Sequence, residues 1–191
     1  MIRWSWMRNN LALKVLFISN SLYVFAALLL GPLYAVYVQR IGGGVLLVSV
    51  STAVFYVSTT LFLLFVARWG DMLKEMELML VVSYIIRGLG FLSYIFIDSA
   101  LLLILSQVVF GLAESLGTPT FGALFAKHID KKEEVMEFSD WAMVSNLVMA
   151  LGTIIGGFIA SSLGFNFLFV TIAILCFVSA GWILFTPRQV L

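Results

Sequence analysis

The sequence predicts an all-α membrane protein with six transmembrane helices. Of its 191 residues, 62% are hydrophobic and only 11% are charged, whereas a soluble domain is about 45–50% apolar and about 25% charged. The mean hydropathy is +1.11, and stretches long enough to cross a bilayer, about 20 apolar residues each, occur six times. This composition excludes a soluble globular protein and a disordered chain. With a net charge of +1, the expected partner is the lipid bilayer and not nucleic acid.

Short polar or glycine-rich segments separate the spans, and residues 1–191 are expected to form a single transmembrane domain. The six predicted spans cover about residues 11–38, 45–66, 78–96, 101–125, 141–161 and 165–185.

The first span is expected to be retained as a helix. Its apolar run is too long for a secretory signal, and no small-residue cleavage site follows it. Gly31 and Pro32 are expected to bend it near its outer end. Glycines at 42–44 separate it from the second span, which ends at a polar and charged segment over 68–77.

Each of the next two spans contains one ionisable residue. Arg87 lies in the third span and Glu114 in the fourth, and a turn at Asp98 and Ser99 joins these spans. The segment 127–140 carries most of the charge and precedes the fifth span.

The last two spans complete the bundle. A tight turn over 161–164 separates the fifth span from the sixth, which is nearly all apolar. Pro187 is expected to stop the last helix, because proline cannot continue one.

The distribution of lysine and arginine predicts the orientation. Arg40 lies alone on one side of the membrane and Arg87 lies within a span. Nine basic residues fall on the other side: Arg3, Arg8, Lys14, Arg68, Lys74, Lys127, Lys131, Lys132 and Arg188. Because basic loops stay in the cytoplasm, both termini are expected to be cytoplasmic, in a multi-pass protein of the inner (cytoplasmic) membrane.

Arg87 and Glu114 are expected to pair. Both lie about 15 Å from the cytoplasmic end of their helices, at a rise of about 1.5 Å per residue. Either charge alone in hydrocarbon costs roughly 2.5–3.5 kcal/mol on insertion scales, and pairing removes much of that cost. The pair is either a structural lock between two spans or a proton or substrate relay, and the two roles are compatible if the lock opens during a transport cycle.

Other polar and small residues also share helical faces within the spans. Polar groups at this depth usually face a cavity or one another, and small residues allow close helix packing. The candidate pathway residues are Asn20, Tyr23, Arg87, Gln107, Glu114, Thr118 and Asn146. The candidate gating or packing residues are Asp71, Gly111, Gly152, Gly156 and Gly157. No enzyme motif and no Cys/His spacing occurs, so neither a catalytic site nor a cofactor or metal is expected.

Three segments carry a resemblance to the major facilitator superfamily. The loop over 67–74 resembles its signature loop, with Asp71 kept, Ala67 in place of a glycine and Met72 in place of a basic residue. The fourth span is similar to the family's fourth helix, with Gly111 in the motif position and Gln107 where many proton-coupled members have arginine. The segment 152–157 is similar to the antiporter motif, with threonine replacing its proline.

The resemblance implies a half-sized transporter. Family members have two six-helix halves, related as parallel repeats about an axis along the membrane normal, and this chain matches one half bundle. It is therefore expected to work as a parallel homodimer that carries an unknown small-molecule substrate by alternating access. The resemblance also implies that Asp71 holds the cytoplasmic gate closed, and Glu114 is the candidate for proton coupling.

Other interpretations remain open. The chain is alternatively a non-transporting accessory or scaffold subunit that pairs with another protein, although a scaffold has no use for a polar cavity face. It is alternatively one half of a longer transporter; Met1 and the stop after the sixth span favour a complete chain. A membrane-embedded enzyme is disfavoured, because no catalytic constellation is found.

Overall fold

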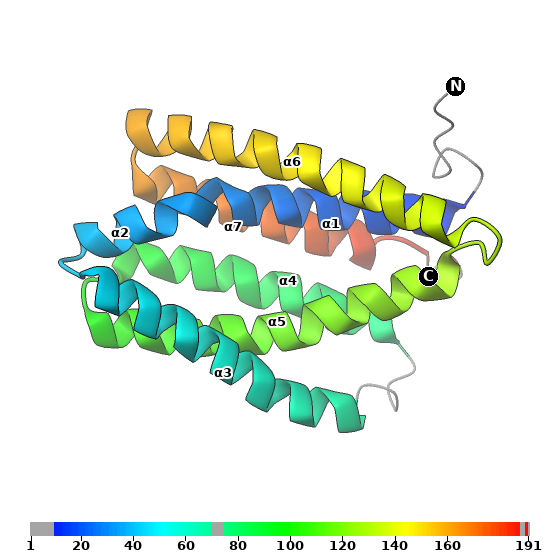
Figure 1. Ribbon diagram of the computed structural model, residues 1–191, viewed down its shortest axis with the longest axis horizontal. Helices are drawn as coiled ribbons and strands as arrows, with labels where there is room; N and C mark the ends of the chain where they lie inside the picture. Colours follow the sequence, from blue (N-terminus) through cyan, green and yellow to red (C-terminus); the bar gives the residue numbers. More distant parts are fainter. Residues whose placement is uncertain (1–9, 70–74, 188–189, 191) are drawn as a thin grey trace.

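The computed structural model describes residues 10–69, 75–187 and 190. Within these residues six helical segments are long and apolar enough to cross a membrane, and they run roughly along the long axis of the molecule (Figure 1). The elements are α1 (Leu11–Leu30), η2 (Gly31–Leu33), α2 (Tyr34–Arg40), α3 (Val45–Trp69), α4 (Met76–Ser93), η4 (Tyr94–Phe96), α5 (Ala100–His128), α6 (Glu134–Ser162) and α7 (Phe165–Leu184). The prediction of an all-α protein with six candidate spans is confirmed.

The ends of the helices follow from local chemistry. The Asn10 side chain accepts a hydrogen bond from the backbone N–H of Leu13 at 3.3 Å, which caps the start of α1. The turns after α2 and α6 require a positive φ, and glycine supplies it at Gly42 (81°) and Gly164 (86°).

The first span is interrupted, as Gly31 and Pro32 predict. α1 ends at Leu30, a single 3₁₀ turn follows, and α2 continues the same span to Arg40. Pro32 has no backbone N–H and therefore cannot extend the hydrogen-bond ladder of α1. The break separates the outer part of this span from α1.

The largest difference from the predicted bounds lies in the fifth span. α6 begins at Glu134, whereas the hydropathy pattern starts at about residue 141. The first turns of α6 contain Glu134 and Glu137, and acidic side chains suit a helix N-terminus because the helix dipole is positive there. An apolar run detects only the part of a helix that lies in lipid, so it misses this polar start.

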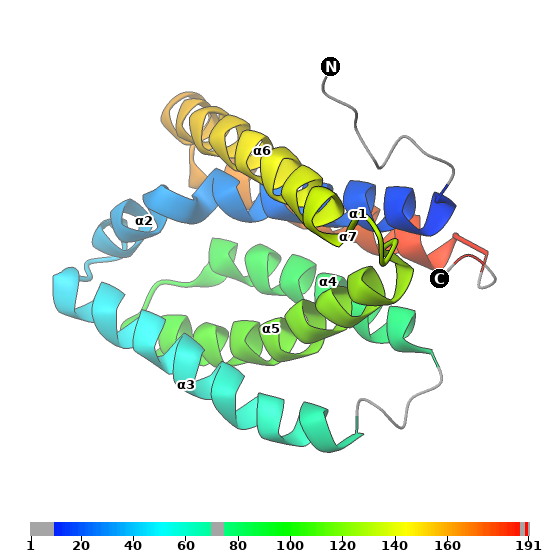
Figure 2. The same cartoon turned by 45° about the vertical axis from the view of Figure 1, so that its right-hand side comes forward.

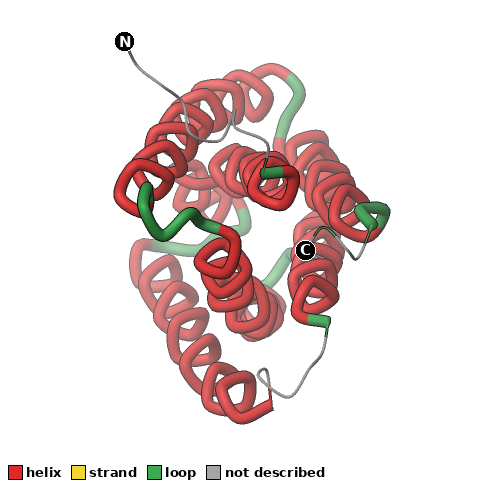
Figure 3. The backbone as a smooth tube through the Cα atoms, turned by 90° about the vertical axis from the view of Figure 1, so that its right-hand side faces the viewer, coloured by secondary structure: helices red, strands yellow, loops and turns green. Residues whose placement is uncertain are grey.

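The helices pack in an order that differs from their order in sequence. α3 packs against α5, α5 against α4, α4 against α7, α7 against α1, and α1 against α6. End-on, this series forms an arc with α3 and α6 at its two ends (Figures 2 and 3). Of the six candidate spans in the described residues, α3 and α6 are the least buried. These two helices therefore offer the most surface to lipid or to a second bundle.

Three of the four predicted packing glycines lie at close helix contacts. A Cβ at Gly111 would come within 2.7 Å of Ser58 on α3, and one at Gly152 within 2.8 Å of a backbone oxygen on α1. A Cβ at Gly156 would overlap the α1 backbone at Leu29. A Cβ at Gly157 would meet no atom within 4 Å, so Gly157 makes no close helix contact within this chain and its gating or packing role stays a prediction.

Aromatic side chains of α1, α5 and α6 contact one another near the end of the bundle at which α1 begins; Figure 1 shows where α1 begins. Phe17 of α1 lies 5.8 Å from Phe125 of α5 and 5.4 Å from Trp141 of α6, measured between ring centroids. Nearby, Asn10 Nδ2 donates a hydrogen bond of 2.7 Å to the backbone oxygen of His128. These contacts hold the ends of α1, α5 and α6 together.

Candidate functional site

An ion pair between Arg87 and Glu114 lies at the centre of the candidate site. Arg87 Nη2 is 2.6 Å from Glu114 Oε2, and it also lies 3.5 Å from the backbone oxygen of Ala113. The pair forms because α4 and α5 run antiparallel and pack together. This packing brings Arg87 and Glu114, which lie at similar depths, side by side. The Arg87 side chain is only 4% exposed, whereas the Glu114 side chain is 29% exposed.

Neighbouring side chains engage both members of the pair. The Tyr23 ring lies 4.0 Å from the Arg87 guanidinium carbon, in a cation–π arrangement. The Thr118 hydroxyl donates a hydrogen bond to Glu114 Oε1. The guanidinium is therefore covered, and the carboxylate is the part of the pair that a ligand or a proton can reach.

A second layer of polar groups supports Tyr23 from behind. The Tyr23 and Tyr84 rings lie 5.2 Å apart, and the Tyr84 hydroxyl donates a hydrogen bond of 3.2 Å to Asn20 Oδ1. Asn20 is 8% exposed and Tyr84 is fully buried. Contacts thus run from Asn20 through Tyr84, Tyr23 and Arg87 to Glu114, and Asn20 supports the site from behind the cavity wall.

An open cavity of about 560 Å³ lies in front of the ion pair. This volume is in the range of small-molecule pockets, about 300–1,000 Å³. Seven of its fifteen lining side chains are aromatic. The lining residues are Tyr23, Ala27, Leu28, Leu30, Gly31, Tyr34, Thr52, Phe55, Tyr56, Arg87, Phe91, Tyr94, Gln107, Phe110 and Glu114.

The cavity occupies the half of the bundle that is farther from the termini. Its lining residues on α1 begin at Tyr23, past the middle of that helix, and those on α5 end at Glu114, near its middle. In the other half, Phe17 contacts Phe125 and Trp141, and a smaller pocket of about 260 Å³ lies between α3, α4 and α5. The ion pair therefore lies near the middle of the bundle, at the end of the cavity nearer the aromatic cluster.

Gln107 lies on the wall of the same cavity. Its Nε2 donates a hydrogen bond of 2.6 Å to the Tyr94 hydroxyl. Farther along the wall, the Tyr34 hydroxyl donates 2.6 Å to Ser51 Oγ, and the Tyr37 hydroxyl donates 2.8 Å to the backbone oxygen of Tyr94. These bonds attach α2 to α3 and η4 beyond the break in the first span.

Two predicted site residues are not part of this constellation. Asn146 is exposed on α6 and does not line the cavity of its own chain, so its role as a pathway residue stays a prediction. Its helix packs mainly along α1, and its ring contacts with α5 lie at Phe121 and Phe125, away from Glu114. Asp71, the predicted gate residue, lies outside the described residues.

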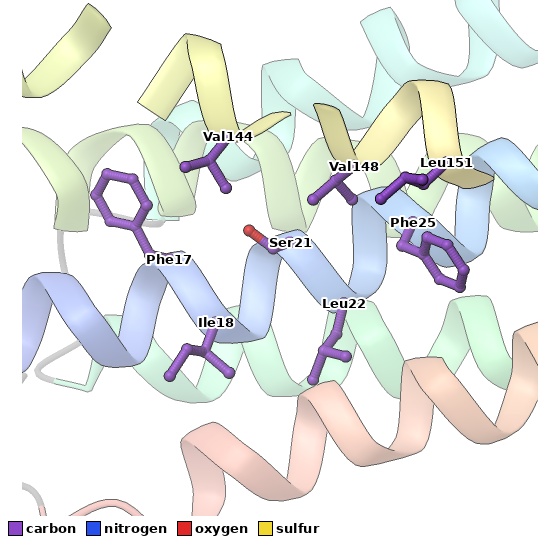
Figure 4. Close-up of a pocket in the computed structure, with 8 residues that line it drawn as sticks. All are labelled: Phe17, Ile18, Ser21, Leu22, Phe25, Val144, Val148 and Leu151. Atoms are coloured by element: carbon purple, nitrogen blue, oxygen red, sulfur yellow. The ribbon is translucent and has the colours of Figure 1, made fainter. Parts of the chain in front are cut away.

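A second groove, between α1 and α6, is almost wholly apolar. It measures about 340 Å³, and Figure 4 shows Phe17 and Ser21 of α1 and Val144 and Val148 of α6 pointing toward one another across it. It has no charged residue in its lining. This groove therefore offers no charged group to a ligand, in contrast to the cavity in front of Arg87 and Glu114.

Sequence reasoning missed most of the aromatic wall of the larger cavity. Of its seven aromatic residues, the sequence predicted a pathway role for Tyr23 alone. Tyr34, Tyr84 and Tyr94 also place their hydroxyl groups in hydrogen bonds inside the bundle. A tyrosine within an apolar span is itself a signal, because its hydroxyl needs a partner when it is buried.

Comparison with known proteins agrees with the helical arrangement. Residues 16–190 match the family described as the Major Facilitator Superfamily. The match includes all six candidate spans apart from the first residues of α1. No curated protein matches the chain significantly.

Proposed function

The chain belongs to the major facilitator superfamily, a family of secondary transporters and not of enzymes, and from this premise we propose that it carries a small solute by alternating access as a parallel homodimer. It is a multi-pass integral membrane protein. The site for the solute is the cavity in front of Arg87 and Glu114.

The observation that carries this proposal is a cavity that one chain does not enclose. Its 560 Å³ is bounded by α1 to α5 with η2 and η4, and it remains open. A transport pathway in lipid must be enclosed, because polar groups facing hydrocarbon are costly. A second bundle facing the first would supply the missing wall.

The packing of α3 and α6 supports a parallel pair. They stand at the two ends of the arc and are the least buried spans of the described bundle. Two copies inserted in the same orientation and related by an axis along the membrane normal would reproduce the arrangement of the family's two halves. In that dimer each pathway residue occurs twice, and Asn146 of one copy becomes available to the cavity of the other.

The lysine and arginine distribution supports cytoplasmic termini and the inner membrane. With that orientation the cavity opens toward the outside, and the cluster of Phe17, Phe125 and Trp141 closes the inside. Asp71 would then hold the inner gate, as the family resemblance implies. Transport requires the aromatic cluster to separate while the outer half closes.

Glu114 is the group proposed to couple protons to transport. It is the more exposed member of the ion pair, and protonation of its carboxylate would release Arg87. A Glu114→Gln variant is expected to lose the pH dependence of transport. If that variant keeps the pH dependence of the unsubstituted protein, Glu114 is not the coupling residue.

Alternating access can be tested without knowing the substrate. Tyr56→Cys samples the outer cavity, and Gly122→Cys samples the inner end of α5, where an added Cβ meets no atom within 4 Å. The native Cys176 is buried and gives a low background.

In the double variant, a bulky impermeant maleimide added from outside should modify Tyr56→Cys. This modification should then lower the rate at which a second maleimide, added from the inside, reacts with Gly122→Cys. The single variant Gly122→Cys, treated in the same way, is the matched control. Independent reaction rates at the two positions would contradict alternating access and favour a static accessory subunit.

A further inference from the structure

We propose that the cavity takes a lipophilic organic cation, meaning an aromatic or alicyclic body that bears one positive charge. The proposal rests on the proposed transport function, because it names the class of solute for the same site. Three independent features of the wall support it: its charges, its ring faces and its hydrogen-bonding groups.

The charges of the cavity are not equally accessible. Arg87 and Glu114 are the two charged residues in its described lining. The Arg87 side chain is 4% exposed and lies under the Tyr23 ring, while 29% of the Glu114 side chain is exposed. A ligand in the cavity therefore meets a carboxylate before a guanidinium, which favours a cation and disfavours an anion.

The aromatic wall favours the same charge. Ring faces are negative and attract cations, and they also bind the apolar body of a ligand. Tyr23 already holds one cation, the Arg87 guanidinium, at 4.0 Å. Tyr56, which is 64% exposed and lies 5.1 Å from Phe55, presents a ring that the chain itself does not cover.

The hydrogen bonds of the wall engage several of its donors and leave acceptor capacity on Glu114 and Gln107. Gln107 donates one amide N–H to the Tyr94 hydroxyl, and Tyr34 donates its O–H to Ser51. Each carboxylate oxygen of Glu114 accepts one bond, from Arg87 or from Thr118, and keeps a second lone pair, and the amide oxygen of Gln107 is not used in these bonds. An anion would need donors, whereas a protonated amine or an onium ion does not.

The test compares two probes of the same shape and opposite charge. Tetraphenylphosphonium and tetraphenylborate are titrated against the full chain in nanodiscs, and empty nanodiscs of the same lipid correct for partitioning. We expect saturable binding of the phosphonium and at least about tenfold weaker binding of the borate, from the attraction between unit charges a few ångströms apart. Equal binding, or tighter binding of the borate, would overturn the proposal.

Matched variants identify the groups responsible. Glu114→Gln should abolish the preference for the phosphonium, and Glu114→Asp should retain it. Tyr56→Leu should weaken phosphonium binding roughly 2- to 5-fold, as expected for an exposed cation–π contact, while Tyr56→Phe should not. Because Tyr56 is largely exposed, its variants report on the site even if Glu114→Gln fails to fold. Equal affinities for Tyr56→Leu and Tyr56→Phe would contradict a role for the ring face.

These results separate the solute class from the transport function. Binding is measured at equilibrium, whereas alternating access is measured by the sided cysteine reactions. Coupled cysteine reactions without a preference for the phosphonium would leave the transporter proposal intact and refute the cation. A preference for the phosphonium with uncoupled reactions would support the cation site and refute alternating access.

Discussion

Breaking the Arg87–Glu114 pair should destabilise the protein unequally, depending on which partner is removed. Glu114→Gln leaves a guanidinium that is 4% exposed without its counter-charge. Breaking a buried pair from one side costs about 3–5 kcal/mol, and the Tyr23 ring that remains over Arg87 places this variant at the lower end, about 3 kcal/mol. Arg87→Met leaves a carboxylate that is 29% exposed and still accepts a bond from Thr118, at a cost of about 1 kcal/mol.

The double variant Arg87→Met/Glu114→Gln should be more stable than Glu114→Gln alone, because no unpaired charge remains. For a chain of this length about 1 kcal/mol corresponds to about 2–4 °C in Tm. Glu114→Gln should therefore lower Tm by about 6–12 °C, and Arg87→Met by about 2–4 °C. The double variant should lie within a few degrees of the unsubstituted protein.

The sole cysteine of the chain provides the assay. Cys176 is fully buried in α7, so a thiol-reactive dye becomes fluorescent only when the bundle opens. The reaction of Cys176 with the dye during heating in lipid-like detergent gives the Tm of the unsubstituted protein, the two single variants and the double variant. Equal losses for the two single variants, with an additive loss in the double variant, would refute the reasoning, because they would mean that the two charges do not stabilise each other.

Three further predictions concern packing and gating. Gly156→Ala should lower the free energy of unfolding by about 1–3 kcal/mol because its Cβ overlaps the α1 backbone, whereas Gly157→Ala should be neutral. The Cys176 assay compares the Tm of the two variants, and equal effects would contradict the packing described. Tyr34→Phe should remove the bond to Ser51 and cost about 1 kcal/mol, and unchanged hydrogen exchange in α2 would speak against that bond as its attachment. Asp71→Asn should raise the rate at which Gly122→Cys reacts from the inside, and an unchanged rate would rule out Asp71 as the gate residue.

The sequence predicted the ion pair because the depth of each residue in the membrane can be counted along its own span. Helix rise and the alternating direction of the spans place Arg87 and Glu114 at the same level, and the cost of an unpaired charge in lipid brings them together. The break in the first span was predictable for a similar reason, since Pro32 removes a specific hydrogen bond.

The shape of the cavity was not predictable in the same way. It depends on which helices are neighbours. The packing order α3–α5–α4–α7–α1–α6 cannot be predicted from the residue pattern of any single span. Asn146 has the polarity expected of a pathway residue, yet it does not line the cavity of its own chain, because α6 packs mainly along α1. Tyr84 connects Asn20 to Tyr23 by contacts between helices, which a pattern within one helix cannot reveal.

The central claim is that one chain forms half of the transport unit, and the mass of the protein in lipid tests it most directly. Native mass spectrometry of the purified chain released from nanodiscs should give a dimer of twice 21.2 kDa, and it should persist at dilutions where random co-occupancy of a disc is negligible. A 21.2 kDa monomer under the same conditions, with no co-purifying partner, would contradict the claim.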